Sequence, residues 1–207
     1  MHNFGKPINE EFKISSSMVN SPYLLIGLGN PGRPYRENRH NVGYMVVDRL
    51  ASRLGVSFTR LESKALVTKT NYRDERLILA KPQTYMNLSG TAVSALQNYY
   101  KIPIENSLVA YDDVDLPFGT IRLRPGGGSA GQKGMASIID RIGTQDIPRL
   151  RVGIDRPPGR MDAAAYVLED FSKQEKEILP SILDRAVEAI FVFITHGLDA
   201  AMNQYNG

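Results

Sequence analysis

Cysteine is absent from the 207 residues of this sequence, and histidine is scarce. The lack of cysteine excludes disulfides, thiolate metal sites and a cysteine nucleophile. It also leaves the redox compartment unmarked, so that a cytoplasmic location is the simplest interpretation. No run approaches the roughly 18 apolar residues that a membrane-spanning helix needs, and we expect no membrane association. Any imidazole chemistry must come from His2, His40 or His196.

Neither sign of charge dominates the sequence. Lys and Arg total 25 against 22 Asp and Glu, which gives a net charge of +3. Such a balance permits an anionic partner without demanding one, and a mildly basic protein with no polyanionic partner fits it equally well. Apolar residues make up 42% and charged residues 23%, and these values are ordinary for a folded domain.

Strand-like and helix-like segments alternate along the chain. Residues 1–21 are polar and irregular, and we interpret them as a loose N-terminal leader before a single domain at residues 22–207. Apolar periodicity predicts strands at 23–26, 66–70, 76–80, 108–111, 120–124 and 150–154, and helices at 43–54, 88–100, 134–142 and from 173 onward. This alternation predicts an α/β fold with a mixed, mostly parallel, twisted sheet and helices on both faces.

Two details of this fold are also predicted. Segment 76–80 is expected to run antiparallel to its neighbours. Ser172 and Glu175 form a capping-box start for the last helix, which is expected to end at Gly197. The apolar period of this helix predicts six inward side chains: Ile178, Leu179, Ile182, Ala186, Ile190 and Phe193.

The first loop matches a dinucleotide-binding pattern. Gly27 to Gly32 follow a predicted strand and fit G-x-G-x-x-G. The dinucleotide version opens a helix at its third glycine, whereas Pro31 and Pro34 keep this loop from becoming helical. Asp48 falls within a predicted helix instead of at the end of a second strand. Dinucleotide binding is therefore the less favoured alternative.

Four motifs follow one another in order. Residues 27–43 read GLGNPGRPYRENRHNVG, residues 81–90 read KPQTYMNLSG, residues 112–119 read DDVDLPFG, and residues 126–134 are rich in glycine. The series resembles the signatures of bacterial-type peptidyl-tRNA hydrolases and covers nearly the whole chain after residue 21. The resemblance implies a monomeric enzyme without a cofactor. Such an enzyme hydrolyses the ester between peptide and tRNA, which frees the tRNA for translation and contributes to ribosome rescue.

His40 is the candidate base for this reaction. Ester hydrolysis needs a water against a carbonyl, a base for its proton, and donors for the oxyanion. His2 lies in the predicted leader, and His196 suits the end of a helix, where a cation is favourable. A histidine in an arbitrary loop is more often a surface or capping residue, so the residues alone leave both interpretations of His40 open.

Asp112 ends a predicted buried strand, a common place for site residues in α/β proteins. The resemblance assigns it to His40 as the carboxylate partner. Taken alone, Asp112, Asp113 and Asp115 could be turn residues before Pro117. No second histidine lies near these acids, and we predict no metal site.

The resemblance also implies the residues that hold the substrate. Asn30 joins His40 and Asp112 in the catalytic set, because it would position the attacked carbonyl. The remaining implied contacts to the substrate and the tRNA are Tyr35, Asn41, Met86, Asn87, Arg124, Lys133 and Arg151. Turn formation by the asparagines and core packing by Met86 are the structural alternatives.

Neither candidate serine fits a covalent mechanism. Ser89 and Ser129 both lie outside a G-x-S-x-G pattern. Ser89 fits better as a helix N-cap. Direct attack by water, without a covalent intermediate, is therefore favoured.

Arginines alternate on two predicted strands. Arg122 and Arg124 lie on one strand and Arg149 and Arg151 on the other, so outward side chains would form a basic stripe. The resemblance implies that Arg124 and Arg151 clamp the 5′-phosphate of the acceptor end, with the acceptor stem and 3′ end as the partner. For Arg122 and Arg149, solvated strand faces are an equal alternative.

Lys133 departs from the family pattern, because it stands where bacterial relatives often have an asparagine. Lysine keeps hydrogen-bond donors, adds a charge and loses an acceptor. This change motivates a rival hypothesis, a non-catalytic RNA-binding protein on the same scaffold.

Overall fold

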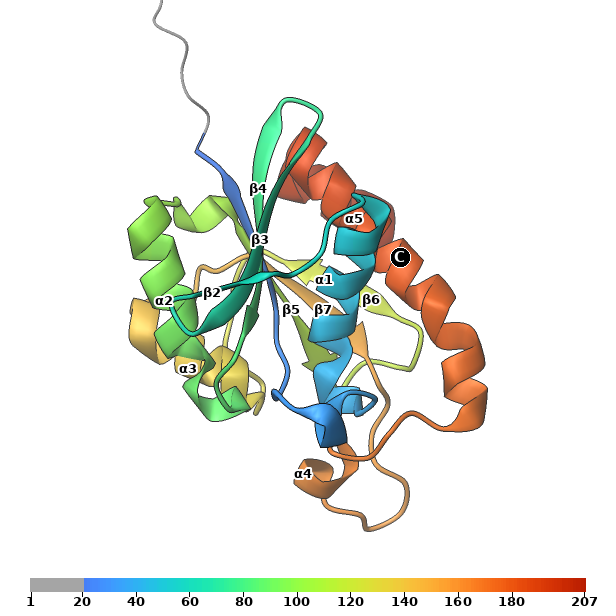
Figure 1. The fold of residues 1–207 in the computed structure, drawn as a ribbon. Helices are drawn as coiled ribbons and strands as arrows, with labels where there is room; N and C mark the ends of the chain where they lie inside the picture. The colour runs from blue at the N-terminus through green and yellow to red at the C-terminus, as the bar shows by residue number, and fades with distance from the viewer. Residues whose placement is uncertain (1–20) are drawn as a thin grey trace, which may run out of the picture.

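A computed structural model describes residues 21–207, which form one seven-stranded sheet covered by helices (Figure 1). The strands are β1 (Tyr23–Gly27), β2 (Arg60–Glu62), β3 (Ala65–Tyr72), β4 (Glu75–Pro82), β5 (Ser107–Asp113), β6 (Ile121–Arg124) and β7 (Arg149–Gly153). Their order in the sheet is β2-β3-β4-β1-β5-β7-β6. The predicted leader lies, apart from Ser21, outside the described residues.

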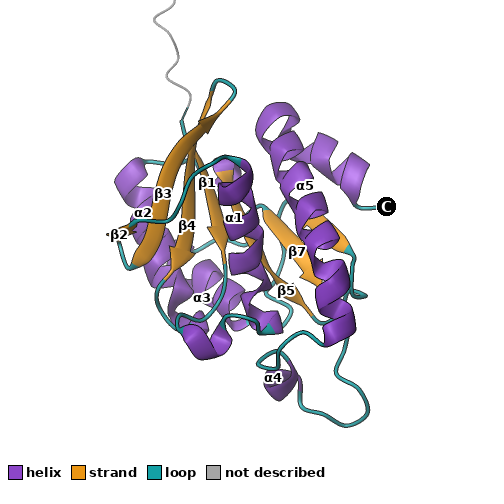
Figure 2. Cartoon of the chain, turned by 45° about the vertical axis from the view of Figure 1, so that its right-hand side comes forward, coloured by secondary structure: helices purple, strands orange, loops and turns teal. Residues whose placement is uncertain are grey.

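Helices cover both faces of the sheet. Helices α1 (Val42–Arg53) and α5 (Lys173–Tyr205) pack on one face, while α2 (Ser89–Tyr100) and α3 (Lys133–Ile142) pack on the other (Figure 2). The short helix α4 (Ala163–Tyr166) lies beyond the carboxyl ends of the central strands (Figure 1). The predicted fold class is therefore confirmed. Within residues 21–207, no helix is long and apolar enough to cross a membrane.

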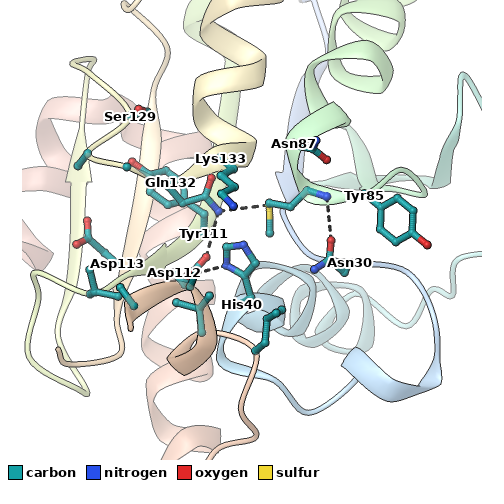
Figure 3. A pocket seen from close by; sticks show the side chains of 18 of the residues that line it. Asn30, His40, Tyr85, Asn87, Tyr111, Asp112, Asp113, Ser129, Gln132 and Lys133 are labelled. Atoms are coloured by element: carbon teal, nitrogen blue, oxygen red, sulfur yellow. Dashed lines mark hydrogen bonds and ion pairs between the residues drawn. The ribbon is translucent and has the colours of Figure 1, made fainter. Parts of the chain in front are cut away.

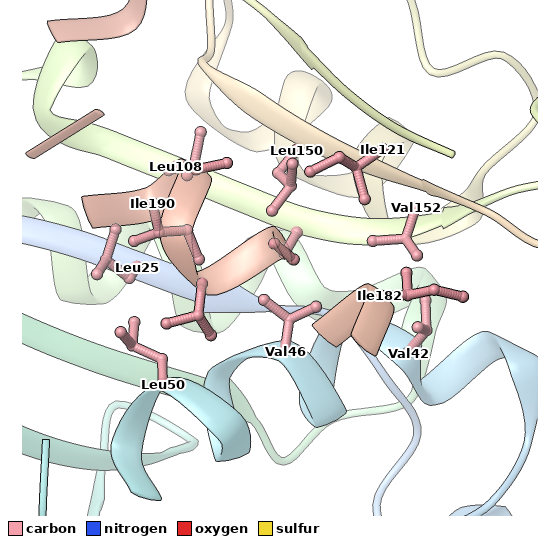
Figure 4. Packing of buried hydrophobic residues seen from close by; sticks show 14 of the residues in the cluster. Leu25, Val42, Val46, Leu50, Leu108, Ile121, Leu150, Val152, Ile182 and Ile190 are labelled. Carbon is pink, nitrogen blue, oxygen red and sulfur yellow. The ribbon is translucent and has the colours of Figure 1, made fainter. Parts of the chain in front are cut away.

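The period-two pattern of the strands builds a separate core on each face. In β1, Leu25 joins the core beneath α1 and α5, while Leu24 and Ile26 join the core beneath α2 and α3. In the first core, strand side chains such as Leu108 and Leu150 lie against Val46, Leu50 and Ile190 of the two helices (Figure 4). All of these side chains are at most 1% exposed, which is the burial that fixes both helix layers on the sheet.

The direction of one strand corrects a prediction. The segment expected to run antiparallel to its neighbours, β4, is antiparallel only to β3 and runs parallel to β1, with Leu79 opposite Leu25. The mixed character of the sheet comes instead from β3 and β6, which run opposite to the other strands. The reason is that a short hairpin turn joins β3 to β4, and strands joined in this way are antiparallel. The connection from β1 to β4 instead crosses over through α1, which allows these two strands to be parallel.

Three details of the helices also differ from the predictions. Gly197 was expected to end α5, but it only interrupts the helix, with φ 84° and ψ 173°, and helical structure continues to Tyr205. Ile178 was expected to face inward and is 52% exposed, whereas the adjacent Leu179 is buried. Ser89 does not cap α2 with its side chain, because its hydroxyl donates a hydrogen bond to Met86 O at 2.8 Å.

Close packing of glycines places the first loop at the end of the sheet. A Cβ atom on Gly27 would lie 2.2 Å from Gly43 O, and one on Gly43 would lie 2.3 Å from Ala110 O. Only glycine allows α1 to begin this close to β1 and β5. The connection after β1 leads to strands on one side of the β1–β5 pair, and the connection after β5 leads to strands on the other side. The carboxyl ends of β1 and β5 therefore form a topological switch point. The residues just before α1 therefore lie where ligands bind in such sheets.

Candidate active site

A pocket of about 650 Å³ opens at the carboxyl ends of β1 and β5. Its walls come from five parts of the chain: the loop after β1, the 3-10 turn Met86–Leu88, the end of β5, the glycine-rich loop with the start of α3, and the segment around α4. In Figure 3, His40, Asp112 and Gln132 lie together on one side of the pocket, with Asn30 and Tyr85 opposite. Segments far apart in the sequence thus share one cavity.

His40 and Asp112 are in direct contact. Nδ1 of His40 lies 2.8 Å from Oδ2 of Asp112, and both side chains are at most 10% exposed. The backbone N–H of His40 donates to Val167 O at 2.8 Å. Because the carboxylate accepts the proton of Nδ1, the ring is held as the tautomer whose Nε2 is an unprotonated acceptor. The pair is arranged as a base with an orienting carboxylate.

Gln132 completes the contacts of Asp112 and was missed as a site residue. Its Nε2 donates to Oδ1 of Asp112 at 3.1 Å, and its Oε1 accepts the N–H of Met135 at 2.7 Å as the N-cap of α3. Both carboxylate oxygens of Asp112 are therefore engaged. The one signal in the sequence was a polar residue two positions before the predicted helix at 134–142, which could have indicated a capping role because the helix begins one residue earlier, at Lys133.

Asn30 is held by two neighbours in the fold. Its side-chain Oδ1 accepts the N–H of Met86 at 2.8 Å, which leaves Nδ2 as the donor available to a bound molecule. Asn41 forms two hydrogen bonds of 2.9 Å with the backbone N–H and C=O of Asn30. Asn41 itself is buried behind the loop and does not line the pocket. It fixes Asn30 from behind.

The other predicted substrate residues are distributed unevenly. Met86 is buried and lines the pocket, as do the exposed Asn87 and Lys133. Tyr35 lies in the 3-10 turn Arg33–Tyr35 and is not part of the lining. Tyr85, which no motif indicated as a site residue, lines the pocket while 63% exposed.

The predicted stripe of outward arginines is wrong at Arg149. This side chain is 1% exposed, and its guanidinium donates to the carbonyls of Ile147, Gly128 and Gln145 at 2.8 to 3.0 Å. The strand alternation correctly placed Arg149 and Leu150 on opposite faces of the sheet, since Leu150 belongs to the core beneath α1 and α5. The face that carries Arg149 is covered at this position by the glycine-rich loop. Arg149 consequently anchors the loop that leads to Gln132.

Arg124 and Arg151 lie on adjacent strands with different surroundings. Arg124 is exposed on β6, whereas Arg151 on β7 is 19% exposed and forms an ion pair with Asp113. Asp113 lines the pocket, so this ion pair connects the pocket to the arginine strands. Asp115 likewise pairs with Arg156 at 2.7 Å. Within residues 21–207, no three His, Cys, Asp or Glu side chains converge as a metal site requires.

Tyr111 lines the pocket and carries its hydroxyl on a side chain that is 2% exposed. Burial raises the pKa of this hydroxyl, and the nearby charge of Arg149 offsets the rise only in part. Tyr111 therefore keeps its proton at neutral pH.

The two candidate serines differ in access to this pocket. Ser89 is fully buried and its hydroxyl is committed to Met86 O. Ser129 lines the pocket, but in the part of the chain that the structure describes no hydrogen bond joins it to His40. Neither serine is paired with the imidazole as an activated nucleophile would be.

Known proteins resemble this chain along nearly all of its described length. A family model described as peptidyl-tRNA hydrolase matches residues 24–207. The peptidyl-tRNA hydrolase of Chloroflexus aggregans is 49% identical over 185 residues, covering 89% of this chain and 98% of that protein. The chloroplastic peptidyl-tRNA hydrolase of Arabidopsis thaliana is 47% identical over 94% of this chain and 68% of its own length. The crystal structure of peptidyl-tRNA hydrolase from Acinetobacter baumannii matches with a TM-score of 0.85 and 32% identity, covering 93% of this chain and 98% of that one.

Proposed function

The chain belongs to the peptidyl-tRNA hydrolase family, and we propose that it cleaves the ester of peptidyl-tRNA by direct attack of a water molecule that His40 deprotonates. Membership makes it a hydrolase that releases tRNA from peptidyl-tRNA. The observation that carries the mechanism is the 2.8 Å contact between His40 Nδ1 and Asp112 within the pocket.

In the proposed reaction, water gives a proton to Nε2 of His40 as its oxygen bonds to the ester carbonyl carbon. The negative charge of Asp112 stabilises the imidazolium that forms, because it lies on the opposite ring nitrogen. Nδ2 of Asn30 donates to the oxygen of the tetrahedral intermediate. The carbon–oxygen bond to the terminal ribose then breaks, and the departing ribose oxygen takes the proton from His40. The products are a peptide with a free carboxylate and a tRNA with a free 3′ end.

The attack by water, without an acyl-enzyme, is supported by the serines. Ser89 has no access to the pocket, and among residues 21–207 no hydrogen bond joins Ser129 to a histidine. His40, in contrast, needs only a water between its ring and the carbonyl.

The pocket residues around this pair are suited to gripping a peptide of variable sequence. Asn87 offers amide donors and an acceptor to the peptide backbone, and Met86 offers an adaptable apolar wall. Asn41 acts through Asn30, whose backbone it holds. We place Tyr35 at the junction of peptide and tRNA, outside the pocket proper.

Cations near the pocket would hold the tRNA. Lys133, exposed at the pocket, is placed to meet the phosphates of the 3′ end, while Arg124 and Arg151 would meet the 5′-phosphate of the acceptor stem. Arg151 would have to share its guanidinium between that phosphate and Asp113. Such contacts give affinity that falls with salt.

A monomeric state and a cytoplasmic location stay predictions, which sedimentation and cell fractionation test.

Replacing His40 by alanine tests the mechanism. With N-acylated aminoacyl-tRNA as substrate, we expect single-turnover hydrolysis to slow by about 10²- to 10⁴-fold, the usual contribution of a positioned base. The matched control is His196→Ala, which removes an exposed imidazole from α5 and should turn over normally.

Near-normal turnover by the His40→Ala protein would remove His40 from the mechanism. If the unsubstituted protein binds the tRNA but shows no hydrolysis between about pH 6 and 8, the result would instead favour the rival hypothesis of an RNA-binding protein.

A further inference from the structure

Arg39, the residue before His40, is a buried cation that the mechanism does not use. It is 6% exposed. Its guanidinium donates to Glu175 Oε2 at 2.8 Å and to the carbonyl of Asp170 at 3.0 Å, and it lies 4.3 Å from the ring centre of Tyr166. A buried guanidinium with a carboxylate, a carbonyl and an aromatic ring as partners fixes the relative positions of the segments that carry them.

All of these partners come from one stretch of chain, residues 166–175. This stretch contains the end of the pocket wall and leads into α5; the wall is formed by Asp162, Ala163, Ala164, Val167 and Leu168. Arg39 therefore contacts the segment that forms the pocket wall and does not contact the pocket itself.

The neighbours of Arg39 bind the same stretch through a different set of atoms. The N–H of His40 donates to Val167 O at 2.8 Å, and the N–H of Arg39 donates to Glu169 O at 3.0 Å. Asn38 donates to the carbonyl of Leu168 and to Oδ1 of Asp170. Three consecutive residues that end at the proposed base are thus bonded to four consecutive residues, 167–170, that start in the pocket wall.

We propose that Arg39 is a positioning residue that sets the pocket wall at residues 162–168 and the His40 imidazole in one arrangement, so that neither can shift without the other. The proposal rests on the proposed function, since it takes His40 as the base. The wall contacts the substrate and His40 contacts the water, so Arg39 influences both binding and chemistry while touching neither reactant.

The chemistry of the site requires a guanidinium. Its planar fork reaches the Glu175 carboxylate and the Asp170 carbonyl together while its face lies on Tyr166. A lysine ammonium is a single point of charge and can satisfy only part of this set. Glu175 also accepts the N–H of Ser172 at 2.6 Å within the capping box of α5, so the start of that helix belongs to the same arrangement.

Three variants separate positioning from general stability. Arg39→Lys keeps the charge and loses the fork. Glu175→Gln keeps an acceptor for Ser172 and loses the negative charge. Arg49→Met is the matched control, because Arg49 on α1 also pairs with an acid of α5, Asp184, at 2.6 to 2.7 Å, but lies away from the pocket wall.

For Arg39→Lys we expect kcat/KM on N-acylated aminoacyl-tRNA to fall about ten- to a hundredfold, with KM raised and kcat lowered together, as for a misplacement of reacting groups by about 1 Å. Glu175→Gln should change both constants in the same direction by less. The loss of kcat/KM in the double variant should be smaller than the product of the losses in the two single variants, because both substitutions remove the same contact between Arg39 and Glu175. Amide hydrogen exchange should accelerate at residues 162–171 and stay unchanged in β1 and β5.

The outcomes are distinguishable from a failure of the mechanism. If His40→Ala hydrolyses normally, the proposed function fails and this proposal falls with it. If His40→Ala is inactive while Arg39→Lys has normal kcat and KM, only the positioning role is overturned. An equal loss in Arg49→Met, or faster exchange throughout the sheet, would mean general destabilisation and would also overturn it.

Discussion

At the scale of single residues, Gln132 determines how the Asp112 carboxylate is held. The Oε1 atom of Gln132 must face the N–H of Met135, because only an oxygen can accept there. Nε2 therefore faces Asp112 as a donor. The cap of α3 and the orientation of the carboxylate are consequently set by one amide, and Asp112 offers its other oxygen to His40.

Gln132→Glu preserves the shape of this side chain and reverses its role. One glutamate oxygen still caps α3, but the other would face Asp112 Oδ1 at a separation near 3.1 Å. Two carboxylates at this distance cannot both be ionised, so one proton is shared and the charge supporting the imidazolium is weakened. We expect kcat at about pH 7.5 to fall at least about tenfold with little change in KM.

Stopped-flow or quench kinetics on N-acylated aminoacyl-tRNA measures this change. Gln97→Glu on α2 adds the same charge away from the pocket and should leave kcat unaltered. Normal kcat in Gln132→Glu would show that Asp112 does not depend on this amide.

The sequence allowed some of these residue contacts to be anticipated and concealed others. His40, Asp112, Asn30 and Met86 could be identified because each lies within a recognisable motif, and the fold brings all four to one pocket. Arg149 was misjudged because alternation along a strand tells which face a side chain takes, but not which loop covers that face. The contact of Gln132 with Asp112 depends on where α3 begins relative to β5, and no local pattern contains that distance.

At the scale of secondary structure, the start of α5 couples a helix cap to a buried ion pair. Ser172 and Glu175 form the reciprocal capping box that the sequence predicted, and Glu175 is also the partner of Arg39. Burial raises the pKa of the Glu175 carboxyl, but hydrogen bonds from Ser172 and the charge of Arg39 outweigh this effect, so the pKa is lowered overall.

This shift predicts acid sensitivity of the folded state. A carboxyl whose pKa is lower in the folded than in the unfolded chain binds fewer protons when folded. Its stabilisation is therefore present above the ordinary value of 4.5 and is lost as the pH falls through the folded value. Glu175→Gln should be less stable than the original protein at neutral pH and should lose less stability between about pH 6 and 3.

Thermal unfolding followed by circular dichroism across that range measures the difference. Glu188→Gln is a suitable control, because Glu188 also lies on α5 and pairs with an arginine, Arg53, in an exposed position where ion pairs contribute little. Parallel pH dependences of Tm for Glu175→Gln and the original protein would contradict the assignment.

The start of α5 was more predictable than its end, and more predictable than the direction of β4. The capping box specifies a start by hydrogen bonds between near neighbours, so Ser172 and Glu175 suffice to predict it. Gly197 has a positive φ that would suit a helix end, yet the residues beyond it return to helical structure because Ala201 is buried against the core. The direction of β4 depends on pairing with β1, which lies about fifty residues earlier in the chain.

At the scale of the whole molecule, topology brings the proposed catalytic pair together. His40 and Asp112 are separated by 72 positions in the sequence and meet because β1 and β5 are adjacent and parallel, with their following loops diverging. The pocket opens at this edge of the sheet. The β3–β4 hairpin turn lies at the opposite edge, since β4 starts there and runs parallel to β1.

Because the pocket and the β3–β4 turn lie at opposite edges of the sheet, the effect of salt on substrate binding should depend on which edge carries a given arginine. Arg124 lies exposed on β6, and no ion pair engages it among residues 21–207, so a phosphate can displace its counterions freely. Arg124→Gln should raise KM without lowering kcat and should reduce the slope of log kcat/KM against log salt by about one, the effect of losing one phosphate contact. Arg73→Gln makes the same change of charge at the β3–β4 turn. Both variants lower the net charge equally, so a general attraction between a basic protein and RNA would reduce both slopes alike. A contact with the acceptor stem reduces only that of Arg124→Gln, and equal slopes in the two variants would remove Arg124 from the tRNA-binding surface.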